Sequence, residues 1–178
     1  MYRSRALFDL RPIHGPDAPW RDVEGALTGA VDRNFLRILA NDCLDSVPPL
    51  TFFQDAVIDD LGEHSPLFHL ERSALTPIVD VARVFGMAAG RLLGGSTRDR
   101  FLLARRLLPS HDALLREASA TFSVLLWQQG RIGIGQGTSG GELPAALLGR
   151  QDRQVLKGGF RVILRLIELT AGWTWLDE

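Results

Sequence analysis

The chain has 178 residues, of which 46% are hydrophobic and 23% charged, and its formal net charge is −1. These values are typical of one globular domain with a sizeable core, and they exclude an intrinsically disordered chain. The near-neutral charge gives no electrostatic reason to expect nucleic acid or an anionic membrane as a partner.

The distribution of apolar residues and cysteine predicts a protein of the cytoplasm. No apolar run approaches the roughly 20 residues that a helix needs to cross a bilayer. The N-terminus carries Arg3, Arg5 and Asp9 instead of the apolar core of a signal peptide. Cys43 is the single cysteine, so it has no partner for an internal disulfide and no companion at metal-ligand spacing. Both features agree with a reducing compartment.

The first predicted element is a short strand over residues 5–13, which ends at Pro12 and a following turn. Because no partner strand follows nearby, we interpret it as the remnant of a sheet in another domain or chain. Residues 17–46 show apolar residues at helical spacing and are predicted to form helices. The polar residues 32–34 allow a break within this helical region.

The consecutive prolines Pro48 and Pro49 end the first helical region. Residues 51–71 place short apolar runs on both sides of a cluster of turn residues, which predicts a β-hairpin or an extended excursion. Thr76-Pro77 then forms a start signal for a helix that runs to about residue 93. This helix is apolar nearly all round, which is typical of a helix in the middle of a bundle.

The remaining helices follow from caps, breaks and periodicity. Ser96 with Asp99 forms a pair similar to a capping box and opens a helix. After Pro109, residues 114–126 indicate a further helix.

The glycine-rich residues 130–141 are predicted to form a loop, and residues 151–173 the last helix. We therefore expect a mainly α fold, an antiparallel up-and-down bundle of four to five helices with the short N-terminal strand and the hairpin-like excursion.

Two glycine motifs resemble nucleotide-binding sequences, and the context of each argues against catalysis. Residues 133–137 read Gly-x-Gly-x-Gly, but they follow a predicted helix instead of a strand, so a flexible connection is the favoured interpretation. Residues 94–96, Gly-Gly-Ser, resemble the phosphate-binding turn of nucleotidyltransferases. No closely spaced carboxylates on a strand follow them to hold Mg²⁺. No Ser-His-Asp or Cys-His constellation supports a hydrolase.

Asp80 and Arg83 are one helical turn apart on a helix that is otherwise almost entirely apolar. Burying one charge alone costs several kcal/mol, so both must be paired or must reach a polar cleft. The first interpretation is an internal salt bridge, which we favour; the second is a ligand-facing polar spot inside the bundle.

The last predicted helix carries Arg153, Lys157, Arg161 and Arg165 at steps of four. Like charges at this spacing repel by a few tenths of a kcal/mol per pair, so an acidic group facing the row would relieve a cost. A nucleotide phosphate or an acidic partner surface would fit. The favoured alternative is a solvated face whose side-chain stems cover apolar surface.

Several blocks of the sequence together resemble one known family. The blocks are Pro48-Pro49-Leu50-x-Phe52-Phe53, Leu70-Glu71, Pro77-Ile78-Val79-Asp80-Val81-Ala82-Arg83-Val84, Ser96-Thr97-x-x-Arg100, Gln129-Gly130 and Asp152-Arg153-x-x-Leu156-Lys157-x-x-Phe160. Over residues 47–169 they resemble the C-terminal substrate-binding domain of the DUF294 nucleotidyltransferases. Residues 7–15 are similar to the end of the nucleotidyltransferase domain of that family.

The resemblance implies a division of the chain into three parts. Residues 1–16 would be the remnant of the nucleotidyltransferase domain, residues 17–46 linking helices, and residues 47–178 the helical substrate-binding domain. Proteins of this family are similar to the uridylyltransferases that modify PII signalling proteins. The sequence begins beyond the point where the catalytic Gly-Ser and metal carboxylates would lie. We therefore expect no activity from this chain alone, and Mg²⁺ and nucleotide only with a separate catalytic domain or subunit.

The implied function is an accessory domain that binds a substrate or partner beside a nucleotidyltransferase active site. The residues implied for an acidic partner or a nucleotide phosphate are Asp80, Arg83, Arg100, Arg153, Lys157 and Arg161, with Asp80 orienting Arg83. The alternative is a stand-alone interaction or homodimerisation module without a nucleotide role. It is suggested by the aromatic residues Trp20, Phe52, Phe53, Trp173 and Trp175. An independent enzyme that uses the glycine-rich segment has the least support.

Overall fold

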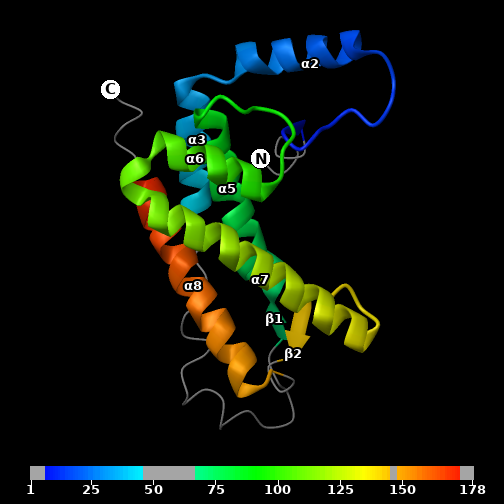
Figure 1. Cartoon of the computed structure of the whole chain (residues 1–178), viewed down its shortest axis with the longest axis vertical. Coiled ribbons are helices and arrows are strands. Elements are labelled where there is room, and N and C mark those ends of the chain that lie inside the picture. Colours follow the sequence, from blue (N-terminus) through cyan, green and yellow to red (C-terminus); the bar gives the residue numbers. More distant parts are fainter. Residues whose placement is uncertain (1–6, 46–66, 145–147, 173–178) are drawn as a thin grey trace.

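The computed structural model of the chain describes residues 7–45, 67–144 and 148–172, and it is mainly helical, as predicted (Figure 1). The described α-helices are α2 (Asp17–Ala30), α3 (Arg33–Leu44), α5 (Thr76–Ala88), α6 (Thr97–Leu107), α7 (Asp112–Gln136) and α8 (Arg150–Ala171). A π-helical turn (Glu71–Leu75) precedes α5, and a 3₁₀ turn (Pro109–His111) precedes α7. Two three-residue strands, β1 (Leu67–His69) and β2 (Glu142–Pro144), pair with each other.

Helix α5 forms the centre of the bundle, as its apolar sequence predicts. It packs against α3, α6 and α8, while α7 packs against α6 and α8. The largest fully buried side chains include Phe85 of α5, Phe101 of α6 and Phe160 of α8. Burying each of these side chains stabilises the fold by roughly 1.5–3 kcal/mol relative to leaving it in water. Helix α2, by contrast, has no buried residue and lies across one end of the molecule (Figure 1).

Local capping signals set two helix starts where the sequence indicates them. Asp32 precedes α3 and accepts a hydrogen bond from the Phe35 backbone N–H at 2.7 Å, which produces the break between α2 and α3. Ser96 and Asp99 form a reciprocal capping box at the start of α6. The hydrogen bonds from the Ser96 backbone and hydroxyl lower the pKa of Asp99, because they stabilise its ionised form.

The predicted N-terminal strand is wrong over the residues that the structure describes. Residue 7 is helical, residues 8 and 9 form a turn, and irregular chain continues to residue 13. The segment is fixed by side-chain contacts instead of strand pairing. Phe8 is buried, with its ring centroid 5.5 Å from that of Phe35.

The predicted hairpin within residues 51–71 is also not supported. Strand β1 lies at the end of this range, but it pairs antiparallel with β2, with Phe68 opposite Leu143 and His69 opposite Glu142. Residues 51–66, which include the other predicted arm, lie outside the described residues. Because β2 is distant from β1 in sequence, the turn residues next to β1 could not indicate this pairing.

The predicted glycine-rich loop is largely helix. Helix α7 continues through Gly130, Gly133 and Gly135, and it ends at Gly137, which adopts the left-handed conformation with φ of 65°. A Cβ on Gly133 would lie 2.7 Å from the Thr138 carbonyl oxygen, which shows how closely the chain folds back after the helix. The turn that follows the helix therefore requires glycine at position 133 inside the helix, although glycine has a weak intrinsic preference for helix.

Candidate functional site

Three of the candidate residues lie together between α5 and α6. Asp80 and Arg83 of α5 and Arg100 of α6 are all buried, with 3%, 4% and 2% of their surfaces exposed. Nη1 of Arg83 donates to Oδ1 of Asp80 at 2.5 Å. The structure thus contains the internal ion pair that the spacing of Asp80 and Arg83 indicates.

The fourth member of this charge cluster is Asp9, from the N-terminal segment. Nη2 of Arg83 donates to Oδ2 of Asp9 at 2.6 Å, and Nη2 of Arg100 donates to Oδ1 of Asp9 at 2.8 Å. Nη2 of Arg100 also donates to the Phe8 carbonyl oxygen at 2.9 Å. Two buried arginines therefore hold one carboxylate whose side chain is still 46% exposed.

The backbone of α5 makes room for this arrangement at Gly86. A Cβ at this position would lie 2.8 Å from Cγ of Arg100, so the stem of Arg100 crosses α5 where only glycine leaves space. Within the described residues, Nε of Arg83 is buried without a hydrogen-bond partner. The two arginines thus contact the carboxylates through their Nη atoms, and Nε of Arg83 takes no part in these contacts.

The charges of the cluster balance, and the ionised state of Asp9 is favoured. Burial by itself raises the pKa of Asp9, but hydrogen bonds from Arg83 and Arg100 and their positive charges outweigh it and lower the pKa below 3.8. Two arginines and two aspartates then sum to zero. The sequence analysis missed Asp9, because the need for a second carboxylate appears only once Arg100 is known to be buried beside Arg83.

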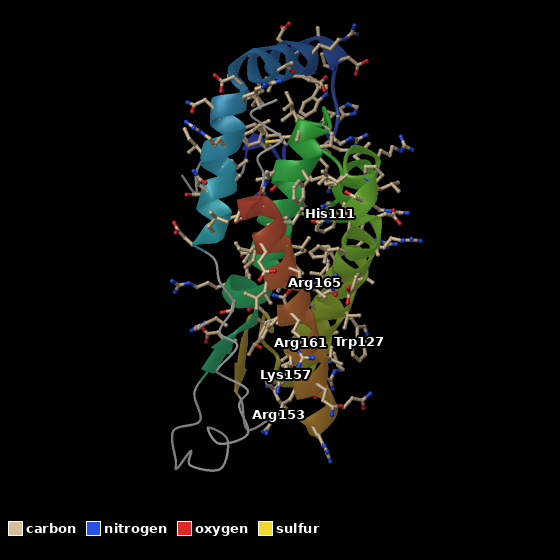
Figure 2. All side chains as sticks on the ribbon, turned by 90° about the vertical axis from the view of Figure 1, so that its left-hand side faces the viewer. His111, Trp127, Arg153, Lys157, Arg161 and Arg165 are labelled. Carbon is tan, nitrogen blue, oxygen red and sulfur yellow. The ribbon has the colours of Figure 1, made fainter. Side chains whose placement is uncertain are left out.

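The other candidate residues form a separate row along α8. Figure 2 shows Arg153, Lys157, Arg161 and Arg165 following one another on this helix. Nη1 of Arg165 lies 3.0 Å from Oε2 of Glu117 on α7. Among the described residues, Lys157 and Arg161 have no ion pair. Arg161 is exposed and Lys157 half-buried.

Helix α7 presents an exposed aromatic side chain on the same side of the molecule as this row (Figure 2). Trp127 is 62% exposed, and the guanidinium of Arg131 lies over its ring at 5.3 Å from the centroid. Arg131 is in turn held by Asp152 of α8 at 2.7 Å. Trp127 was not among the predicted residues, because helical periodicity alone does not show that a tryptophan faces solvent.

The aromatic residues that suggested an apolar interaction surface are only partly testable. Trp20 is half-buried and packs against the core. Phe52, Phe53, Trp173 and Trp175 lie outside the described residues.

Two further properties concern only the described part of the chain. No three His, Cys, Asp or Glu side chains in it come together as a metal site would require. None of its helices combines the length and apolar character that crossing a membrane requires.

Comparison with known proteins gave one match. The model of a family described as "Putative nucleotidyltransferase substrate binding domain" matches residues 33–172, which span α3 to α8. The searches of curated proteins and of solved structures gave no match.

Proposed function

We propose that the chain, which belongs to this family of nucleotidyltransferase substrate-binding domains, acts as an accessory domain that binds an acidic substrate or protein partner for nucleotidyl transfer. The observation that carries the proposal is the cationic row on α8. The proposed setting is a cytoplasmic signalling protein similar to the PII uridylyltransferases. Residues 1–16 would then belong to a preceding nucleotidyltransferase domain. Of the predicted linking residues 17–46, α2 would link the two, because α3 lies within the matched range and packs against α5 and α8.

The α8 row is suited to an acidic partner because part of its charge is uncompensated. Glu117 neutralises Arg165 at one end, whereas Lys157 and Arg161 have no ion pair within the described residues. Their mutual repulsion, a few tenths of a kcal/mol, is relieved when an acidic group lies against them. Trp127 adds an exposed aromatic surface, and tryptophan and arginine are the residue types most enriched at binding hot spots.

The buried cluster has a different proposed role. The carboxylates of Asp9 and Asp80 already engage Arg83 and Arg100. A ligand would have to displace Asp9 to reach them. We assign to the cluster the task of fixing the N-terminal segment on the bundle, in line with the expected direction of the catalytic domain.

Catalysis is proposed to depend on a separate nucleotidyltransferase domain or subunit, which would supply Mg²⁺ and nucleotide. Incubation of the purified chain with radiolabelled ATP or UTP and Mg²⁺ is expected to give no transfer of the label to protein. Transfer that a Lys157→Gln variant loses would instead make this chain an enzyme and contradict the accessory role.

The binding proposal is tested with a fluorescein-labelled octaglutamate peptide, followed by fluorescence anisotropy. We expect the Lys157→Gln, Arg161→Gln double variant to bind about tenfold more weakly, which corresponds to about 1.4 kcal/mol. The control is the Arg11→Gln, Arg106→Gln double variant, which removes the same charge from exposed positions on other elements. Equal losses in both variants would show that only net charge matters and would refute the assignment to α8.

A second candidate function, self-association, is favoured by a specific feature of α7. Val124, Trp127 and Ile134 lie at helical spacing and are 43%, 62% and 87% exposed. An apolar face of this kind can form an interface between copies of the chain. Sedimentation velocity over a concentration series distinguishes this candidate, because only a dimer interface predicts a concentration-dependent mass that Trp127→Ala abolishes.

A further inference from the structure

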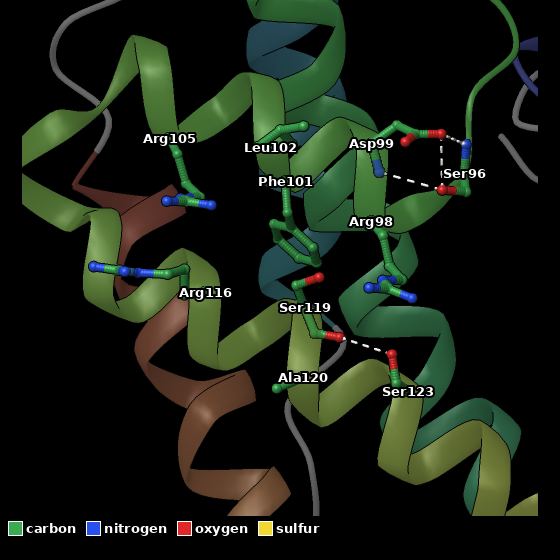
Figure 3. Close-up of a pocket in the computed structure, with 10 residues that line it drawn as sticks. All are labelled: Ser96, Arg98, Asp99, Phe101, Leu102, Arg105, Arg116, Ser119, Ala120 and Ser123. Atoms are coloured by element: carbon green, nitrogen blue, oxygen red, sulfur yellow. Dashed lines mark hydrogen bonds between the residues drawn. The ribbon is translucent and has the colours of Figure 1, made fainter.

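A hollow of about 520 Å³ lies between α6 and α7, away from the α8 row (Figure 3). Its walls combine arginine and serine side chains with a small apolar surface. Arg98 and Arg105 come from α6, and Arg116, Ser119 and Ser123 come from α7. Figure 3 shows Arg105 and Arg116 near one end of the hollow and Arg98 near the other.

Two of the arginines are pre-oriented by a single carboxylate. Asp112, at the start of α7, accepts a hydrogen bond from Nε of Arg105 at 2.5 Å and also forms an ion pair with Arg116. The hydrogen bond from Arg105 is the main cause that lowers the pKa of Asp112. Because Asp112 binds Arg105 through Nε, the Nη groups of Arg105 remain available. One carboxylate between two guanidinium groups leaves one positive charge uncompensated.

Asp99 is the acidic residue that itself lines the hollow, at the end where Arg98 lies. Oδ2 of Asp99 accepts hydrogen bonds from the Ser96 backbone N–H and hydroxyl, both at 2.9 Å, as part of the α6 capping box. Arg98 has no ion pair within the described residues. The hydrogen bonds that Asp99 accepts come from neutral groups, so Asp99 keeps its negative charge, which offsets that of the neighbouring Arg98. The excess positive charge of the hollow therefore lies at the end formed by Arg105 and Arg116.

The middle of the hollow offers hydroxyl groups and an apolar surface. The Ser123 hydroxyl donates to the Ser119 carbonyl oxygen at 3.2 Å, and the Ser119 hydroxyl has no partner among the described residues. Leu102 is 48% exposed and lies beside Phe101 on the α6 wall. A ligand bound here would meet cationic groups at its ends and an apolar surface along its body.

We propose that this hollow is a binding site for a small phosphate-bearing ligand. Guanidinium groups bind phosphate through two parallel hydrogen bonds, and serine hydroxyls add further donors. A volume of about 520 Å³ lies within the range of pockets that hold small molecules. The site is independent of the α8 row, so it goes beyond the proposed binding of an acidic partner.

Isothermal titration of the full chain with inorganic pyrophosphate and, separately, with ATP in the absence of Mg²⁺ tests the proposal. We expect measurable heat of binding, and we expect the Arg98→Gln, Arg116→Gln double variant to bind about tenfold more weakly. Both side chains are exposed, so the substitutions should leave the fold intact. Tighter binding of ATP than of pyrophosphate would identify a nucleotide as the ligand. Equal binding would identify the phosphate group as the part that is recognised.

Two further variants make the outcome specific. Ser119→Leu keeps the charge but fills the hollow, and it is expected to reduce binding as strongly as the loss of the arginines. Lys157→Gln with Arg161→Gln is the matched control and is expected to bind both probes normally. The proposal is overturned if neither probe binds at millimolar concentration, or if the α8 control loses as much affinity as the pocket variants. Loss of octaglutamate binding alone would concern only the proposed function.

Discussion

Replacing Asp9 by Asn isolates the contribution of the N-terminal segment to the stability of the bundle. The substitution keeps the size of the side chain but removes its negative charge. Arg83 and Arg100 then retain Asp80 as the remaining carboxylate of the cluster, so one buried positive charge is left without a counter-charge. Removing one member of a buried ionic group is destabilising mainly because its partner stays behind unpaired.

The magnitude follows from the two hydrogen bonds that Asp9 accepts. A hydrogen bond to a charged group contributes roughly 1.5–3 kcal/mol to stability, so two such bonds set an upper value of roughly 3–6 kcal/mol. The Asp9 side chain is 46% exposed, and solvent screening reduces this value. We therefore expect Asp9→Asn to lower the free energy of unfolding by about 2 kcal/mol. For a domain of this size, that corresponds to a decrease of roughly 4–8 °C in Tm.

The pH dependence of the effect has a defined sign. The pKa of Asp9 in the folded chain is lower than its value of 3.8 in the unfolded chain. The stabilisation by the carboxylate is therefore fully present above about pH 4, and it is lost as the pH falls through the lowered pKa. The difference in unfolding free energy between the wild type and Asp9→Asn should shrink below pH 4, because acid protonates the same carboxylate.

Urea unfolding followed by circular dichroism at pH 7 and at pH 3 measures both effects. The matched control is Asp22→Asn, which removes one exposed carboxylate from α2 and should change the free energy of unfolding by less than about 0.5 kcal/mol. If Asp9→Asn unfolds at the same urea concentration as Asp22→Asn at pH 7, the buried arginines do not depend on Asp9 and the reasoning fails.

The remaining predictions use the same urea assay on other elements. Gly133→Ala should destabilise the chain by roughly 1–3 kcal/mol, because its Cβ would lie 2.7 Å from a carbonyl oxygen. Gly135→Ala has open space around its Cβ and should stabilise α7 by up to about 1 kcal/mol. If Gly135→Ala were the more destabilising of the two, the close contact between Gly133 and the residues that follow α7 would be contradicted. Ser96→Ala should cost about 1 kcal/mol through the lost N-cap. Glu117→Gln should change stability by less than about 0.5 kcal/mol, because its ion pair with Arg165 is about half exposed on both sides, and a larger loss would indicate a stronger bridge.

Signals confined to a few neighbouring residues made the helical fold predictable. The Ser96–Asp99 pair, the Asp32 cap and the apolar face of residues 155–169 each depend on spacing within one or two turns, and the structure contains all three. The family resemblance, which also came from local blocks, is confirmed over residues 33–172.

The failed predictions concern segments whose conformation depends on distant partners. Residues 7–13 have the composition of a strand, but Asp9 contacts Arg83 and Arg100, which are 74 and 91 positions away in the sequence. The glycine-rich segment is a different case, because the atoms that leave no space for a side chain at Gly133 belong to residues 138–140, which directly follow the helix. Intrinsic propensity contains neither fact, so it wrongly assigned a strand to residues 7–13 and a loop to the glycine-rich segment.

The candidate site could also be predicted only in part, namely where the signal lies within one helix. Asp80 and Arg83 could be identified because charge on an apolar helix demands a partner, and the α8 row because its spacing is regular. Asp9 required the knowledge that Arg100 is buried beside Arg83. The hollow between α6 and α7 could not be predicted, because it depends on how the two helices lie relative to each other. The spacing of residues within Arg98–Arg105 or within Arg116–Ser123 gives no information about that.

Helix α6 shows how one cationic segment serves two purposes. Arg100 faces α5, where it is 2% exposed and holds Asp9, whereas Arg98 and Arg105 face the hollow beside α7. Helical geometry separates them, because residues two positions apart point to different sides. The inward arginine is matched by carboxylates because an unpaired buried charge would destabilise the fold. The outward arginines are under no such requirement: Arg105 shares the carboxylate of Asp112 with Arg116, and the one positive charge left over is available to a ligand. The net charge of −1 therefore says little about binding. It averages over arginines that are paired inside the fold, such as Arg100, and arginines at the hollow whose charge is only partly compensated.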